Sequence, residues 1–383
     1  MRTHFFKRHQ GFSLTEVIVG MAMGVIVLLI IMQSLSTAEQ YKRTATNGAD
    51  AQINGLMALR ALESEVRMAG AGTTNGANLC PSVNTYYDGA GTTSKVGMPV
   101  KITDGATSAT NFSDKIEVVY SSSLTGAMPT HITDAMPAAS NVTRVSNVAG
   151  MNTCDFVRFA AKDGSKTCAV LQITDVSNNG IQFLTSSGQS NYNPNGGAQA
   201  ASLFPAGGYT TDDIIINMGQ NIDREYRVVK DGTNDQFYFQ KNSVSPGASG
   251  CGTADPNPQL NMVSNVVNIQ AQYGVANVSS QEVSCWTSAA ATDVGCGIST
   301  GNWSAPVAAD VKRIKAVRVA VVVRSAIAEK PSSGATCNTT TTAPMSWDGG
   351  PAITLTHVPN WQCYRYKVFQ TVIPIINVIW ANI

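Results

Sequence analysis

The chain has 383 residues, of which 13% are charged, whereas the usual share in soluble proteins is ~25%. Its formal net charge is +1 at pH 7, and Arg2, Lys7 and Arg8 give the first 11 residues three positive charges. The remainder is therefore close to neutral, which excludes the strongly basic surface of a nucleic-acid-binding protein. The length allows a large buried core.

The N-terminal region contains a segment long enough to cross a bilayer. No charged residue occurs from Val17 to Ala38, a run of 22 residues, and ~20 apolar residues span a membrane as a helix. A secretory signal is cut after its apolar region, usually following small residues, and no such site stands just after Met32. The Gly11–Phe12 junction is the better candidate for cleavage, and the apolar helix then stays with the mature protein.

Glu16 lies at the N-terminal edge of this segment, four residues after Phe12. A charge inside a membrane costs a few kcal/mol, about 3 at the helix centre, unless it is paired. A plain membrane anchor has no use for this carboxylate. The position of Glu16 therefore indicates a role beyond anchoring.

The helical pattern continues beyond the membrane segment. Apolar residues recur at three- and four-residue spacing and share one helix face; they are Ile53, Leu56, Leu59, Leu62, Val66 and Ala69. The glycine-rich stretch Met68–Gly72 ends the helix. Gly48 and Gly55 are soft points, and the sequence leaves open whether the helix is continuous through them.

After residue 70, short runs rich in Val, Ile, Tyr and Phe alternate with turn residues, which predicts β-structure. The expected strands are 115–120, 156–161, 169–175, 181–184, 213–217, 226–229, 237–241, 266–273, 317–324 and 364–373. In Val317–Arg324, every second residue from Val317 to Val323 is valine on one face, and Arg318 and Arg324 lie on the other, so this segment is expected to be a central strand. Four long polar stretches are expected to be surface loops; they are 185–211, 242–258, 276–306 and 331–360.

Eight cysteines all follow the apolar segment, which favours an oxidising compartment and disulfide bonds. Proximity favours the pairs Cys285–Cys296 and Cys337–Cys363. Cys154 and Cys168 flank a predicted hairpin, but a two-residue turn at Asp163–Gly164 pairs Cys168 with Phe159, so a Cys154–Cys168 bond stays open. The chain has four histidines and no C-x-x-C, which argues against zinc. No metal or cofactor is expected.

The stretch "GFSLTEVIVG" resembles the class III signal of type IV prepilins and pseudopilins. The resemblance implies that a membrane prepilin peptidase/methyltransferase cuts after Gly11 and methylates the new amine of Phe12. It also implies that Glu16 pairs with the Phe12 amine of a neighbouring subunit during assembly. Pairing within one chain is the alternative, because residues four apart on a helix are neighbours.

Gly20 and Gly24 form a G-x-x-x-G step, which permits close helix packing. Glycine is also common in membrane helices without such a role. The sequence does not decide between these two interpretations.

Three C-terminal blocks resemble the PilW-like minor pilins of type IV pili, as does the helix end at Leu62–Gly72; the blocks are Val267–Val275, Val311–Ser325 and Tyr364–Pro374. The resemblance implies an α+β, type IV pilin-like fold, with a long N-terminal helix packed on a β-rich, disulfide-bearing head. The expected parts are a removed leader (1–11), a transmembrane half-helix (12–34), a periplasmic amphipathic half-helix (35–70) and the head (71–383).

By the same resemblance, the chain is a structural minor pilin that starts assembly and occupies the fibre tip. Its expected location is the inner membrane, single-pass with a periplasmic head, and then the extracellular pilus. Its expected partners are the prepilin peptidase, the other minor pilins, the major pilin and the inner-membrane assembly platform.

Two alternatives remain: a minor pseudopilin of a type II secretion system, and an adhesin with a pilin stem. The sequence contains no hydrolase, metalloprotease or nucleotide-binding motif, so an enzyme is not expected. His131 and His357 fall in polar stretches and are expected to be solvated. Tryptophans 286, 303, 347 and 361 stand in loops, where they either contact a partner or cover a loop core.

Overall fold

The computed structural model describes most of the chain in two units, residues 1–50 and 51–383. The segments that it does not describe are 1–12, 76–77, 106–111, 124, 126–127, 140, 178, 187–188, 221, 233–234, 244–258, 330–335, 341–344 and 381–383. The predicted Gly11–Phe12 cleavage site and Cys251 lie outside the described residues.

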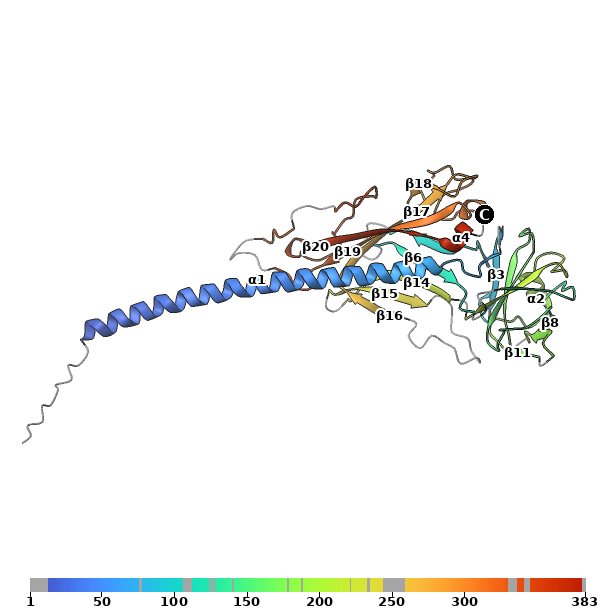
Figure 1. Cartoon of the computed structure of the whole chain (residues 1–383), viewed down its shortest axis with the longest axis horizontal. Helices are drawn as coiled ribbons and strands as arrows, with labels where there is room; N and C mark the ends of the chain where they lie inside the picture. Colours follow the sequence, from blue (N-terminus) through green and yellow to red (C-terminus); the bar gives the residue numbers. More distant parts are fainter. Residues whose placement is uncertain are drawn as a thin grey trace, which may run out of the picture. The chain divides into compact units, whose positions relative to one another are not determined.

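Helix α1 runs from Leu14 to Met68, 55 residues (Figure 1). The backbone is helical through Gly48 and Gly55, the two soft points of the sequence. The helix ends at glycines, because Gly70 and Gly72 have φ of 82° and 68°, a left-handed conformation that glycine adopts without a steric penalty.

Within the second unit, α1 packs through a face of mostly small residues. The buried apolar members of this face are Ala51, Ala58, Leu62 and Val66, and Ala69 continues it directly after the helix end. The apolar face predicted from the sequence was partly wrong, because it included Ile53 and Leu56, which are 56% and 57% exposed. Small residues bring the helix closer to the sheets than large aliphatic residues would.

The described strands of the second unit form five sheets (Figure 1). A five-stranded sheet has the order β16 (Gln259–Ser264), β15 (Phe237–Ser243), β14 (Ile222–Lys230), β6 (Lys115–Tyr120) and β5 (Val100–Thr103). A four-stranded sheet has the order β18 (Val283–Thr287), β17 (Val266–Ala276), β19 (Ile314–Arg324) and β20 (Tyr366–Pro374). All pairings in these two sheets are antiparallel.

A six-stranded sheet has the order β4 (Gly91–Lys95), β3 (Val83–Tyr87), β10 (Cys168–Gln172), β9 (Phe156–Ala160), β13 (Ile214–Gly219) and β7 (Pro129–His131). Its β3–β10 pair is parallel. The smaller sheets are β11 (Asp175–Val176), β12 (Gln182–Leu184) and β8 (Val142–Arg144), and the pair β1 (Thr74–Asn75) and β2 (Asn78–Leu79). The remaining helices are α2 (Gly197–Leu203), α3 (Ala308–Val311), the 3₁₀ turn η1 (Trp361–Cys363) and α4 (Ile376–Trp380).

The buried apolar residues form separate clusters. The largest joins α1 to the five- and four-stranded sheets. Two others cover opposite faces of the six-stranded sheet: Val157 and Phe159 of β9 belong to one, Phe156 and Ala160 to the other. This alternation follows from the two-residue period of a strand. The six-stranded sheet is therefore buried on both faces at its centre.

The α+β class is confirmed, and β19 is an interior strand as the valine pattern predicts. The prediction of surface loops was partly wrong for two segments, since 185–211 contains α2 and 276–306 contains β18. Trp303 and Trp347 are 0% and 8% exposed, so both lie in the core. His131 is exposed, but His357 is partly buried and stacks on Phe112 with ring centroids 4.0 Å apart.

The structure pairs Cys285 with Cys296 and Cys337 with Cys363, the two pairings that proximity favours. Cys168 bonds to Cys80 across 88 residues, so the Cys154–Cys168 bond that the sequence left open does not form. The hairpin register was also wrong by one residue, because Phe159 lies opposite Ala169 and not Cys168.

Candidate functional site at the N-terminal helix

Glu16 lies in the first turn of α1, where it caps the helix. The Ser13 N–H donates to Glu16 Oε2 at 3.0 Å, and the Thr15 N–H donates to Ser13 Oγ at 3.2 Å. Ser13-x-x-Glu16 is thus a capping box, in which the third helical residue reaches back to the N-cap N–H. This Ser-x-x-Glu signal can be read directly from the sequence.

The capping contact turns the Glu16 carboxylate back toward the start of the chain. A carboxylate in the first turn is also favoured by the partial positive charge of the helix N-terminus. Phe12, which would carry the new amine after cleavage, precedes Ser13 directly but lies outside the described residues. The predicted roles of Gly11, Phe12 and Glu16 therefore stay predictions.

The helix from Leu14 to Glu39 is 26 residues long and apolar enough to cross a membrane, and none of it is buried within the chain. Its large apolar side chains are well exposed; Ile18, Val25, Leu28 and Ile31, for example, are 48–60% exposed. An apolar surface of this size is unstable in water and indicates contact with lipid or with other helices. Length and composition alone do not distinguish an anchor from a signal sequence.

Gly20 and Gly24 are open in the described chain. A Cβ added at either position would meet no atom within 4 Å. Nothing inside the single chain therefore requires glycine there. A packing role between chains stays a prediction.

Among the described residues, no three His, Cys, Asp or Glu side chains are grouped as metal ligands.

Two family models match the chain. Residues 6–32 match the prokaryotic N-terminal methylation motif, and residues 225–377 match type IV pilus-assembly protein W, PilW. The two matches together fit a PilW-like pilin with a prepilin signal. No curated protein and no solved structure is significantly similar to it.

The PilW match supports a minor pilin related to type IV pili, and the methylation motif implies processing by a prepilin peptidase. The region that matches PilW begins in β14 and ends in α4, so it includes the whole four-stranded sheet. The strands of the six-stranded sheet all lie between residues 83 and 219 and are outside both matches. This sheet is therefore the part of the head about which the matches say least.

Proposed function

We propose that the chain is a minor pilin of the inner membrane that starts assembly of a type IV pilus and remains at the fibre tip. It crosses the membrane once and holds its head in the periplasm before assembly. The observation that carries this proposal is the unburied apolar helix Leu14–Glu39, with a single carboxylate in its first turn, inside the matched methylation motif.

Cleavage after Gly11 gives Phe12 a positive amine, and a neighbouring subunit's Glu16 is its partner in the fibre. Two charges in a bundle of apolar helices stabilise each other more strongly than in water, whereas an unpaired partner leaves a desolvated charge. This penalty selects the register in which subunits stack. In the single chain, Glu16 accepts the Ser13 N–H instead, and that exposed contact is easily exchanged.

The exposed face of α1 supports the same role. Ile53, Leu56 and Met57 are 54–57% exposed and lie outside the membrane-spanning stretch. Together they offer an apolar surface that suits a neighbouring helix. The chain acts through these contacts as a structural subunit and not as an enzyme.

The test compares Glu16→Ala with Glu39→Ala in the native host. Both variants remove one carboxylate, at opposite ends of the same apolar helix. Glu16→Ala is expected to keep cleavage, seen as an N-methyl-Phe12 terminus by mass spectrometry, while fibre number falls severalfold. Immunogold labelling of the head is expected at fibre ends in the wild type.

Glu39→Ala is expected to leave fibre number near the wild-type value. Normal fibre number and normal tip labelling in the Glu16→Ala strain would contradict the pairing mechanism. Labelling along the whole shaft would contradict the tip position.

A further inference from the structure

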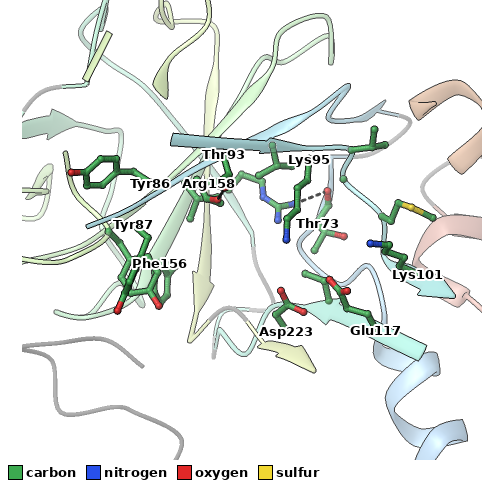
Figure 2. Close-up of a pocket in the computed structure, with 18 of the residues that line it drawn as sticks. Thr73, Tyr86, Tyr87, Thr93, Lys95, Lys101, Glu117, Phe156, Arg158 and Asp223 are labelled. Carbon is green, nitrogen blue, oxygen red and sulfur yellow. Dashed lines mark hydrogen bonds between the residues drawn. The ribbon is translucent and has the colours of Figure 1, made fainter. Parts of the chain in front are cut away.

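The head contains a cavity of about 560 Å³ between the six-stranded and the five-stranded sheets (Figure 2). The volume lies within the range of small-ligand sites, ~300–1,000 Å³. Most of its lining residues precede residue 225, with 304–306 as the exception. The cavity is therefore built mainly by the part of the head that the PilW match does not include.

One wall presents a buried arginine that has no carboxylate partner in the part of the chain that the structure describes. Arg158 of β9 is 5% exposed, and the one side-chain hydrogen bond that it makes to a described residue runs from Nη1 to the Thr73 carbonyl oxygen at 3.0 Å. Its Nε is buried without an acceptor in the described structure. Burial lowers the pKa of Arg158 to about 10, so the guanidinium stays charged at neutral pH. An unpaired buried charge costs several kcal/mol, about 3–5 where a partner has been removed.

The opposite wall presents the carboxylate of Asp223 (Figure 2). Asp223 of β14 has a buried Oδ1 with no hydrogen-bond donor among the described residues. Burial and the nearby charges of Glu117 and Glu225 raise the pKa of Asp223 to about 7, although Lys95 and Lys101 act in the opposite direction. Neither lysine lies within ion-pair distance of Asp223 in the described structure. Arg158 and Asp223 line one cavity but do not pair with each other.

The cavity also has an apolar side. Phe156 and Tyr192 form an edge-to-face pair with ring centroids 4.8 Å apart, and Tyr87 packs on Tyr192 at 5.2 Å. Val83 and Val170 line the same side. Such an aromatic wall accommodates an apolar side chain of a ligand.

We propose that this cavity binds a zwitterion of the amino-acid or short-peptide class, with its carboxylate at Arg158, its ammonium at Asp223 and an apolar side chain against Phe156 and Tyr192. Such a ligand supplies an acceptor to the Arg158 guanidinium and a donor to Asp223 Oδ1, which lack these partners among the described residues. A purely apolar ligand would leave both groups without them, which is unfavourable. The inference adds a ligand to the head and does not depend on the assembly role of the helix.

The test uses the full-length chain in detergent and three probes: the dipeptide Ala-Phe, its C-terminal amide and its N-acetyl form. Isothermal titration is expected to give Kd below about 1 mM for Ala-Phe. The amide lacks the carboxylate and is expected to bind at least ~10-fold more weakly, since a hydrogen bond to a charged group contributes about 1.5–3 kcal/mol. The N-acetyl form lacks the ammonium and is expected to bind more weakly as well.

Asp223→Asn tests whether the ammonium of the ligand lies at Asp223, because it removes the negative charge and keeps the shape of the side chain. It is expected to weaken Ala-Phe about tenfold and to leave the N-acetyl form unchanged. Arg158→Gln is expected to abolish the preference for the acid over the amide. Asp212→Asn, at an exposed carboxylate outside the cavity, is the control and is expected to bind all three probes as the wild type does.

Equal affinity for all three probes would overturn the proposal, because the charges would then play no part. Absence of Ala-Phe binding at millimolar concentration to the folded wild-type chain would overturn it as well. If Arg158→Gln does not fold, the comparison of acid with amide on the wild-type chain still decides the carboxylate assignment.

Discussion

Gly55 on α1 and Phe369 on β20 approach so closely that no side-chain carbon fits between them. A Cβ at Gly55 would lie 2.1 Å from Cε2 of Phe369, far inside the van der Waals distance of ~3.5 Å. The helix and the four-stranded sheet therefore meet at a position without a side chain. A glycine that the sequence marks as a weak point of the helix is a contact point in the structure.

Gly55→Val is expected to destabilise the head by about 1–3 kcal/mol, because it overpacks this contact. Urea unfolding of the full-length chain in detergent measures the change. Gly48→Ala is the matched control, since a Cβ there meets nothing within 4 Å; it is expected to stabilise the helix by about 0.5–1 kcal/mol. An unchanged unfolding midpoint for Gly55→Val would show that Phe369 moves aside without cost.

Glu65 of α1 connects the helix to the five-stranded sheet. It accepts hydrogen bonds from Tyr120 Oη at 2.9 Å and from Arg224 Nη1 at 3.0 Å. Glu65→Ala is expected to lower the free energy of unfolding by about 1–3 kcal/mol, because Arg224 and Tyr120 lose a charged partner in a partly buried place. The measurement is again the urea midpoint.

Glu63→Ala serves as the control for Glu65→Ala, since Glu63 pairs with Arg67 at 2.7 Å with side chains 39% and 45% exposed. An exposed i,i+4 pair contributes about 0.3–0.5 kcal/mol. If both variants change stability equally, the Glu65 contacts do not hold the helix to the sheet.

The sequence was most informative where one local pattern decides the structure. Alternating valines predict β19, and the apolar run from Val17 predicts the membrane-competent part of α1. Prediction from the sequence failed where a contact between segments far apart in the sequence decides the structure. β3 (Val83–Tyr87) has the polar sequence VNTYY, and its place next to β10 depends on a parallel pairing with a segment more than 80 residues away.

The same distinction applies to the candidate sites. The Gly11–Phe12 signal is a contiguous motif and is readable without a structure. The cavity is not, because Arg158 and Asp223 come from different sheets and neither belongs to a local pattern. Only the fold brings them to opposite walls of one space.

His357 is expected to make the head less stable as the pH falls. Burial lowers its pKa to about 4, below the value of ~6.5 in an unfolded chain. Between these two values the unfolded state binds a proton that the folded state excludes, so stability is complete above about pH 6.5 and decreases toward pH 4. His357→Phe keeps a ring against Phe112 and removes the group whose protonation causes this pH dependence.

Urea midpoints measured from pH 7 to pH 4 test the effect of His357. The midpoint of the wild type is expected to fall more steeply than that of His357→Phe. His131→Gln, at an exposed histidine, is the control and is expected to follow the wild type. Parallel curves for the wild type and His357→Phe would mean that His357 is protonated in the folded head.

The Cys80–Cys168 bond is expected to stabilise the head more than the Cys285–Cys296 bond does. The two bonds close loops of 88 and 11 residues, and a longer loop removes more chain entropy from the unfolded state, a difference of about 2 kcal/mol in the chain-entropy model. Cys80 and Cys168 are also 4% and 1% exposed, so replacing both by alanine leaves space in the core and adds to the cost. Thermal unfolding of Cys80→Ala/Cys168→Ala is therefore expected at a lower temperature than that of Cys285→Ala/Cys296→Ala. The reverse order of unfolding temperatures would mean that the shorter loop contributes more to the stability of the head. This loop begins in β18, and its Gly295 carbonyl oxygen accepts a hydrogen bond from the buried Trp303.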